Sequence, residues 1–164
     1  SLSEELIDRT LDIRIAGIHD LCYMVGTVAQ NTQAIVKAIE NPRIDIISHP
    51  DDARIPIDYD TIVDAAKENH TLLEVNNSSL DCLSSRVGAW KNLQTMLKLC
   101  EDRKVPVIAD TDSHFADAVG VFDHVSVLFE ELDFPEELVI NRSVDLLKKE
   151  IKKHRMIRKI GKQG

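Results

Sequence analysis

The chain has 164 residues, a length that suits one domain with its own hydrophobic core, and 43% of its residues are hydrophobic and 29% charged. A net charge of -8 and an aromatic content of 4% disfavour a nucleic-acid partner, because phosphate backbones attract basic surfaces and single strands stack on aromatic rings. No apolar run approaches the ~18 residues of a membrane span, and no signal-peptide pattern opens the chain. The three cysteines form no CxxC pair, which disfavours a thiolate zinc site and is typical of a reduced, cytoplasmic protein.

Strand and helix patterns alternate along the chain after a short lead-in over residues 2–10. Apolar runs predict strands over residues 11–18, 44–48, 71–75 and 105–109, and a short fifth strand over residues 138–140. Amphipathic stripes and caps predict helices from Thr27 or Asn31 to Ile39, from a cap at Asp58 to Asn69, from Ala89 to Arg103, from Val121 to Leu132, and after a cap at Ser143. This alternation indicates right-handed βαβ units, a parallel sheet and a single α/β domain over residues 1–164.

Polar side chains cluster where the predicted strands end. They are His19, His49, Asn76, Asn77, Asp112 and His114. In parallel α/β folds, ligands bind at the carboxyl edge of the sheet, so we expect these side chains to lie near one another. Imidazole nitrogens and carboxylate oxygens suit Zn²⁺, Mn²⁺ or Fe²⁺, and the pattern therefore predicts a site for divalent metal ions.

The segment from Val107 to His114 carries this pattern most densely. Asp110, Asp112 and His114 occupy alternate positions, which share one side of an extended backbone and could meet one ion. The alternative interpretation is a polar turn that closes a buried strand.

The other candidates also have simpler interpretations. His19 or His49 alone could be a hydrogen-bonded core histidine, and Glu74 could support a metal ligand or be a buried, paired carboxylate. His70, His124 and His154 fall at a helix end, inside a helix and in the charged tail, and we interpret them as structural. None of these three histidines is a candidate metal ligand.

Five motifs together resemble the PHP (polymerase and histidinol phosphatase) family, in particular its small stand-alone phosphatases. They are Ala16–Asp20 (AGIHD), Asn31–Ala34 (NTQA), Ile46–Pro50 (IISHP), Leu73–Ser79 (LEVNNSS) and Thr111–His114 (TDSH), and their order spans essentially the whole chain. The resemblance implies a distorted seven-stranded β/α barrel with a cluster of two or three metal ions at its carboxyl mouth. The implied chemistry is hydrolysis of phosphoesters.

The resemblance also assigns roles to individual residues. His19 corresponds to the histidine of the family's GxHE motif, with Asp20 in place of the usual Glu, and His49 corresponds to the histidine of SHP. These two would bind one metal. Asp112 and His114 match the final DSH motif, in which each serves a different metal, so that Asp110 drops out as a ligand.

A further set of residues matches the segment near the family's phosphate site: Asn76, Asn77, Ser78 and Arg86. Arg86 suits this role because a guanidinium holds a phosphate through two parallel hydrogen bonds.

The chain departs from the family at its front, where HxH, TDH and a bridging Glu are absent. It corresponds to about the C-terminal two-thirds of the family's domain, which predicts a partial barrel of about five parallel strands with an open edge. The first residue is Ser, which hints at a tag remnant or a fragment. Three explanations compete: a fragment of a full enzyme, a missing part supplied by a separate polypeptide, or a natural short variant that covers its edge as a homo-oligomer.

These observations predict a metal-dependent phosphomonoesterase that acts on a small phosphorylated substrate. A metal-activated water would attack phosphorus, Arg86 would stabilise the equatorial oxygens, and Asp112 or His114 would orient the water or protonate the leaving oxygen. Because the bridging carboxylate is missing, we expect weak metal binding and little turnover from this chain. The rival prediction is a non-catalytic binding module, and the acidic charge disfavours a PHP nuclease acting on DNA.

Overall fold

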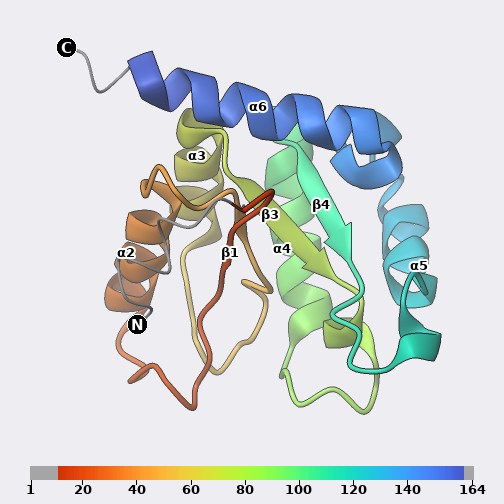
Figure 1. Cartoon of the computed structure of the whole chain (residues 1–164). Coiled ribbons are helices and arrows are strands. Elements are labelled where there is room, and N and C mark those ends of the chain that lie inside the picture. The colour runs from red at the N-terminus through yellow and green to blue at the C-terminus, as the bar shows by residue number, and fades with distance from the viewer. Residues whose placement is uncertain (1–10, 161–164) are drawn as a thin grey trace.

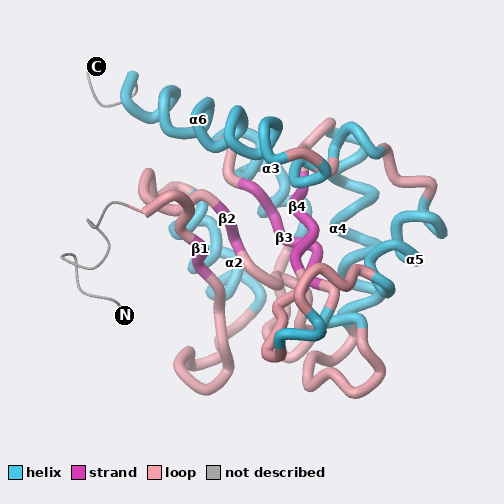
Figure 2. Tube along the Cα trace, turned by 45° about the vertical axis from the view of Figure 1, so that its right-hand side comes forward, coloured by secondary structure: helices cyan, strands magenta, loops and turns pink. Residues whose placement is uncertain are grey.

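Four parallel strands lie side by side in chain order at the centre of the structure (Figures 1 and 2; Figure 2 labels all four), a computed structural model that describes residues 11–160. The strands are β1 (Ile15–Ala16), β2 (Ile46–Ile47), β3 (Leu72–Asn76) and β4 (Val107–Asp110), and each pairs in parallel with the next. The predicted α/β class and parallel sheet are therefore confirmed. The lead-in over residues 2–10 lies outside the described residues.

Five α-helices follow from the predicted amphipathic segments. They are α2 (Val28–Ile39), α3 (Tyr59–Asn69), α4 (Ala89–Arg103), α5 (Asp123–Leu132) and α6 (Val144–Ile160). Thr27 begins α2 through a capping box with Gln30, and Asp58 caps α3. Asn31, the other candidate cap, is fully buried, and its side-chain amide donates to the Pro56 carbonyl. Besides these α-helices, the described residues form four short 3₁₀ turns: Ser78–Leu80, Ala116–Ala118, Glu136–Leu138 and Ile140–Arg142.

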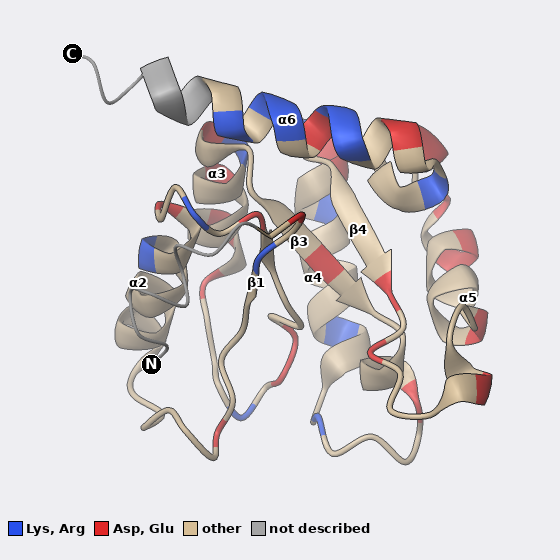
Figure 3. Ribbon diagram, viewed as in Figure 1, with Lys and Arg blue, Asp and Glu red and all other residues tan. Residues whose placement is uncertain are grey.

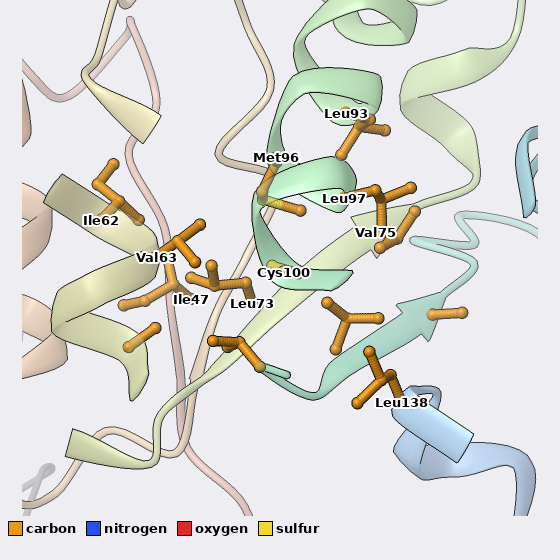
Figure 4. Packing of buried hydrophobic residues seen from close by; sticks show 14 of the residues in the cluster. Ile47, Ile62, Val63, Leu73, Val75, Leu93, Met96, Leu97, Cys100 and Leu138 are labelled. Atoms are coloured by element: carbon orange, nitrogen blue, oxygen red, sulfur yellow. The ribbon is translucent and has the colours of Figure 1, made fainter. Parts of the chain in front are cut away.

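The sheet is covered differently on its two faces because successive strand residues point to opposite sides. Leu73 and Val75 of β3 pack with Leu97 of α4 in the main core beneath α2 to α5 (Figure 4). Leu72 points to the other face and joins a smaller cluster with Ile151 of α6. Helix α6 runs across the sheet near the amino-terminal ends of β3 and β4 (Figures 1 and 2). The carboxyl half of this face is left for polar side chains.

The predicted fifth strand over residues 138–140 is wrong. This segment forms two 3₁₀ turns, and only one isolated parallel bridge joins Val139 to Val107. The reason is that the side-chain amide of Asn141 occupies the edge of β4, where it accepts from the Ala109 amide at 3.1 Å and donates to the Ala109 carbonyl. The described sheet therefore has four strands rather than five, and the expected partial barrel is not established.

The first two strands are shorter than predicted. At their start, the Asp45 carboxylate accepts from the Arg14 amide at 2.8 Å, so that a side chain takes the place of a backbone ladder bond. Strand pairing consequently covers only two residues of each strand. None of the helices within residues 11–160 is long and apolar enough to cross a membrane.

Candidate active site

The candidate residues lie at the carboxyl ends of the strands, on the edge of the sheet that faces away from α6. His19 follows β1, His49 follows β2, Asn76 ends β3, and Asp112 follows β4. Acidic side chains also gather at the carboxyl ends of β3 and β4, whereas Lys and Arg line much of α6 (Figure 3). The site is thus assembled from segments that are distant in sequence and adjacent in the sheet.

The predicted histidine pair does come together. The ring centroids of His19 and His49 are 4.7 Å apart, with the planes inclined by 71°. Gly17 makes room for them, because a Cβ there would lie 2.2 Å from the Ser48 hydroxyl and 3.2 Å from the His49 ring. Burial, together with the charges of Arg86 and His19, lowers the pKa of His49 to about 4. His49 is therefore neutral at pH 7, the form of imidazole that binds metal ions.

The side chain of Glu74, on β3, hydrogen-bonds to the backbone of His49. This side chain, 4% exposed, accepts a 2.5 Å hydrogen bond from the His49 backbone amide and another from the Asn76 side chain at 3.1 Å. Burial raises its pKa to about 7. Of the two interpretations of Glu74, the structure shows the buried, paired carboxyl group. Its partner is the backbone amide of His49, a residue proposed to bind a metal ion.

The backbone is strained at two of the predicted ligands. His49 and Asp112 have φ values of 33° and 48°, in the left-handed region that non-glycine residues seldom adopt. Such conformations persist where surrounding contacts enforce them, and they cluster at functional sites. Glu74 provides such a contact at His49, and Arg86 provides one at Asp112.

Arg86 reaches across from the loop after β3 to Asp112 after β4. Its Nη2 donates to Asp112 Oδ2 at 3.0 Å, and its Nη1 donates to Ser79 Oγ at 2.9 Å and to Asn76 Oδ1 at 3.4 Å. Burial acts to raise the pKa of Asp112, but hydrogen bonds from Arg86 and Asn76 outweigh it and hold this pKa below its usual range. Asp112 is therefore an anion at neutral pH. Sequence reasoning missed Ser79, although it belongs to the LEVNNSS motif.

The Asn77 side chain bonds to the backbone of α5 and does not face Arg86. Its Oδ1 accepts from the backbone amides of His124 and Val125, both at 3.0 Å, and this anchors the first turn of α5. Ser78 lies beside it in a 3₁₀ turn. Neither side chain bonds to Arg86, so that the phosphate-binding candidates separate into an Asn76–Arg86 group and an Asn77–Ser78 group.

A cleft of about 380 Å³ opens next to Asp112 and His114. Its other lining residues include Asn77, Ser78 and Phe115. The His114 ring is exposed, and its Nδ1 lies 2.9 Å from the Asp112 carbonyl oxygen. The cleft therefore has room for part of a small molecule beside the proposed catalytic residues.

The sequence Asp51-Asp52-Ala53-Arg54 directly follows the SHP motif and connects the loops of the site. Arg54 binds Asp52 and reaches Asp20, beside His19, at 2.7 Å. Asp51 is fully buried, and the Ser79 hydroxyl and the charge of Arg86 both act on its carboxylate. Burial raises its pKa to about 6. The only signal in the sequence was the density of charge directly after His49.

The donors suit a divalent cation in kind but are too few to enclose one. Within residues 11–160, no group of three or more His, Cys, Asp or Glu side chains is arranged to hold a metal ion. His19 and His49 form one pair, and Asp112 and His114 follow another strand. A tetrahedral or octahedral shell needs four or six ligands, so each pair fits only part of a shell.

Curated proteins are similar in sequence to most of this chain, although no protein-family model matches it. It is 42% identical over 137 residues to a probable phosphatase of Clostridium acetobutylicum, covering 84% of this chain and 55% of that protein. It is 40% identical over 152 residues to a probable phosphatase of Caldanaerobacter subterraneus subsp. tengcongensis, covering 92% and 59% respectively. A probable phosphatase of Clostridium novyi is 39% identical over 140 residues, covering 85% of this chain and 56% of that protein. The chain thus spans little more than half the length of the relatives that it matches, and these relatives are named as phosphatases.

Proposed function

We propose that this chain forms part of a metal-dependent phosphomonoesterase of the PHP type. The observation that carries the proposal is the meeting of Arg86 with Asp112 at the same sheet edge as the His19–His49 pair. Anion-binding and metal-binding side chains at one edge are what phosphoryl transfer requires, because its catalysis consists mainly of positioning and charge stabilisation. The names of the relatives support the same reaction class.

The proposed metal ligands are His19 and His49 for one divalent ion, with Asp112 and His114 each serving another. Zn²⁺, Mn²⁺ or Fe²⁺ suits these donors. When bound, such ions lower the pKa of a water molecule and offset charge on the phosphate. The remaining ligands would come from a preceding segment of a longer protein or from a partner chain.

The chain's own residues bind the substrate and move its protons. Arg86 binds the phosphate oxygens, while Ser79 and Asn76 fix the orientation of the guanidinium. Asp112 orients the attacking water and accepts its proton, and His114 helps to position that water in the cleft, where the leaving oxygen is protonated from solvent. Ser78 lines this cleft, and Asn77 contributes by holding α5 against it.

The substrate we propose is a small phosphorylated molecule, and the proposed location is the cytoplasm. The cleft of about 380 Å³ matches a small leaving group. The net charge of -8 opposes contact with a long phosphate backbone, so nucleic acid is not a proposed partner.

The test is phosphatase activity on small phosphomonoesters with added Mn²⁺ or Zn²⁺. Two proteins are compared: the 164-residue chain, and the longest reading frame that contains it. We expect metal-dependent turnover from the longer protein, its loss in Arg86→Gln, and little turnover from the chain alone. Robust turnover by the chain alone would contradict the proposed incompleteness, and an inactive longer protein would contradict the phosphatase assignment.

A second candidate is a binding module that associates through its sheet edge. Among the described residues, β1 pairs only with β2, and the Ile15 side chain is 54% exposed. Open edges of this kind pair readily with another chain. Light scattering of the purified chain tests this function, since a concentration-dependent dimer favours it and a strict monomer opposes it.

A further inference from the structure

We propose that His124 and Asp81 together bind a hydroxyl group of the substrate's leaving group, so that the substrate is a phosphomonoester of a hydroxylated, uncharged alcohol. The inference rests on the proposed function and names the substrate class of the same site. Both residues line the cleft of about 380 Å³ that also contains Asp112 and His114. His124, which sequence position alone assigns a structural role, has a side chain that is 43% exposed at the wall of this cleft.

The two side chains come from different segments, and hydrogen bonds fix each of them. Asn77, which directly follows β3, accepts from the His124 amide at 3.0 Å through its Oδ1, and its own amide donates to the Asp110 carbonyl of β4 at 2.8 Å. His124 is therefore tied to the sheet edge that carries the proposed catalytic residues. One oxygen of Asp81 accepts from the Leu83 amide at 2.8 Å, while the other, Oδ2, lies toward the His124 ring.

The separation of the pair suits one bridging hydroxyl. His124 Nε2 and Asp81 Oδ2 are 3.9 Å apart, too far for a hydrogen bond to each other. An oxygen atom at about 2.8 Å from each of them can bond to both at once. A carboxylate only accepts and an imidazole N–H donates, whereas an alcohol does both. A hydroxyl therefore satisfies both sides of the pair, because it accepts from the ring and donates to the carboxylate.

The charge of the cleft restricts the rest of the leaving group. Asp123 lines the cleft together with Asp81, and neither Lys nor Arg lines it within residues 11–160. A second phosphate or a carboxylate on the leaving group would meet like charges there without a compensating cation. An ammonium group only donates, so it would leave the His124 N–H without an acceptor. The proposed class is therefore a monophosphate of a neutral polyol.

The experiment compares glycerol 3-phosphate with propyl phosphate, which has the same carbon chain but lacks both free hydroxyl groups. Each ester is titrated into the isotope-labelled chain, and its affinity is measured from the shifts of amide resonances. We expect the unsubstituted chain to bind glycerol 3-phosphate roughly tenfold more tightly, the combined effect of two modest hydrogen bonds. Because both esters carry the same phosphate, the ratio of their affinities does not respond to a general loss of phosphate binding.

Two substitutions should remove this preference. His124→Phe keeps a ring but has no hydrogen-bonding nitrogen, and Asp81→Asn keeps an acceptor for the Leu83 amide but turns a donor toward the ligand. Either change should bring the affinity ratio below about twofold. Asp117→Asn is the charge-matched control, since it changes an exposed residue of the 3₁₀ turn after His114 that does not line the cleft, and it should keep the ratio unchanged. The amide spectra verify folding, and His124→Leu replaces His124→Phe if the latter is misfolded.

Equal affinities for the two esters would overturn the proposal, as would a preference that survives both substitutions or tighter binding of aminopropyl phosphate. The same esters then serve as substrates for the longest reading frame that contains the chain, where the preference is measured as a ratio of kcat/KM values. If the chain binds neither ester, this ratio decides, and an absent preference or an inactive longer protein overturns the proposal. Preferential binding without any hydrolysis would refute the phosphatase and leave the hydroxyl site supported. Hydrolysis of both esters with equal kcat/KM would do the reverse.

Discussion

Glu74→Gln should remove a pH dependence from the stability of the metal-free chain. Glu74 is 4% exposed, and burial raises its pKa from 4.5 to about 7 in the folded state. Between these two values the folded chain holds a proton that the unfolded chain has released. The free energy of unfolding therefore falls as pH rises through this window, and it levels off above the folded pKa.

The size of the effect follows from the shift. A change of one pKa unit corresponds to about 1.4 kcal/mol, so the full shift of Glu74 amounts to roughly 3 kcal/mol, most of which falls between pH 5 and pH 8. Glutamine keeps the shape and an acceptor for the His49 amide but cannot ionise. The unsubstituted chain should thus lose that amount of stability relative to Glu74→Gln over this range.

The assay is urea unfolding of both proteins at half-unit pH steps in the presence of a chelator, with the m values compared at each step. Asp51→Asn is the matched control, because burial raises the pKa of Asp51 to about 6 and its window lies at lower pH. Identical pH slopes for Glu74→Gln and the unsubstituted chain would refute the reasoning. A slope that disappears only with Asp51→Asn would transfer the effect to that residue.

Three further predictions concern the support of the fold and the site. The Arg155 guanidinium of α6 donates to the buried carboxylate of Asp45, which precedes β2, at 2.8 Å. A double-mutant cycle on this pair should give a coupling free energy of about 1–2 kcal/mol in urea unfolding, and a value near zero would show that the contact does not stabilise the fold. Gly17→Ala should lower the free energy of unfolding by about 1–2 kcal/mol, because the added methyl group crowds the Ser48 hydroxyl. Adding Ser48→Ala should restore part of this stability in the same assay. If it restores none, the Ser48 hydroxyl is not the cause of the loss. Cys100, fully buried with its pKa raised to about 12 by burial, should react with a thiol reagent far more slowly than the two exposed cysteines, and equal rates for all three would contradict its burial.

Much of the candidate site could be predicted because it depends on strand ends and local motifs. His19 and His49 follow successive parallel strands, and parallel pairing alone brings such positions to one edge. Arg86 was predicted to bind phosphate, but its pairing with Asp112 crosses 26 residues and depends on how a loop folds back. No periodicity encodes such a contact.

Other features were missed because side chains replace backbone interactions there. The apolar composition of residues 138–140 predicts a strand, and this prediction is wrong because the Asn141 side-chain amide makes the hydrogen bonds that a strand would have made with β4. Asn77 carries a polar side chain of the kind that binds ligands, but its side-chain oxygen accepts hydrogen bonds from two backbone amides of α5. In both cases an Asn side chain imitates backbone, which the sequence does not distinguish from an Asn that faces a ligand.

The sequence by itself determined the alternation of strands and helices, the cap at Asp58, and the edge at which polar residues gather, whereas the choice of Thr27 over Asn31 as the cap of α2 came from the structure. These features follow from periodicity and local hydrogen bonding, which act within a few residues. Only the tertiary structure decided that the described sheet stops at four strands, that Glu74 supports His49, and that Asp112 holds Arg86. Those outcomes depend on burial and on contacts between distant segments, because a buried polar group takes whichever partner the packed chain brings within reach.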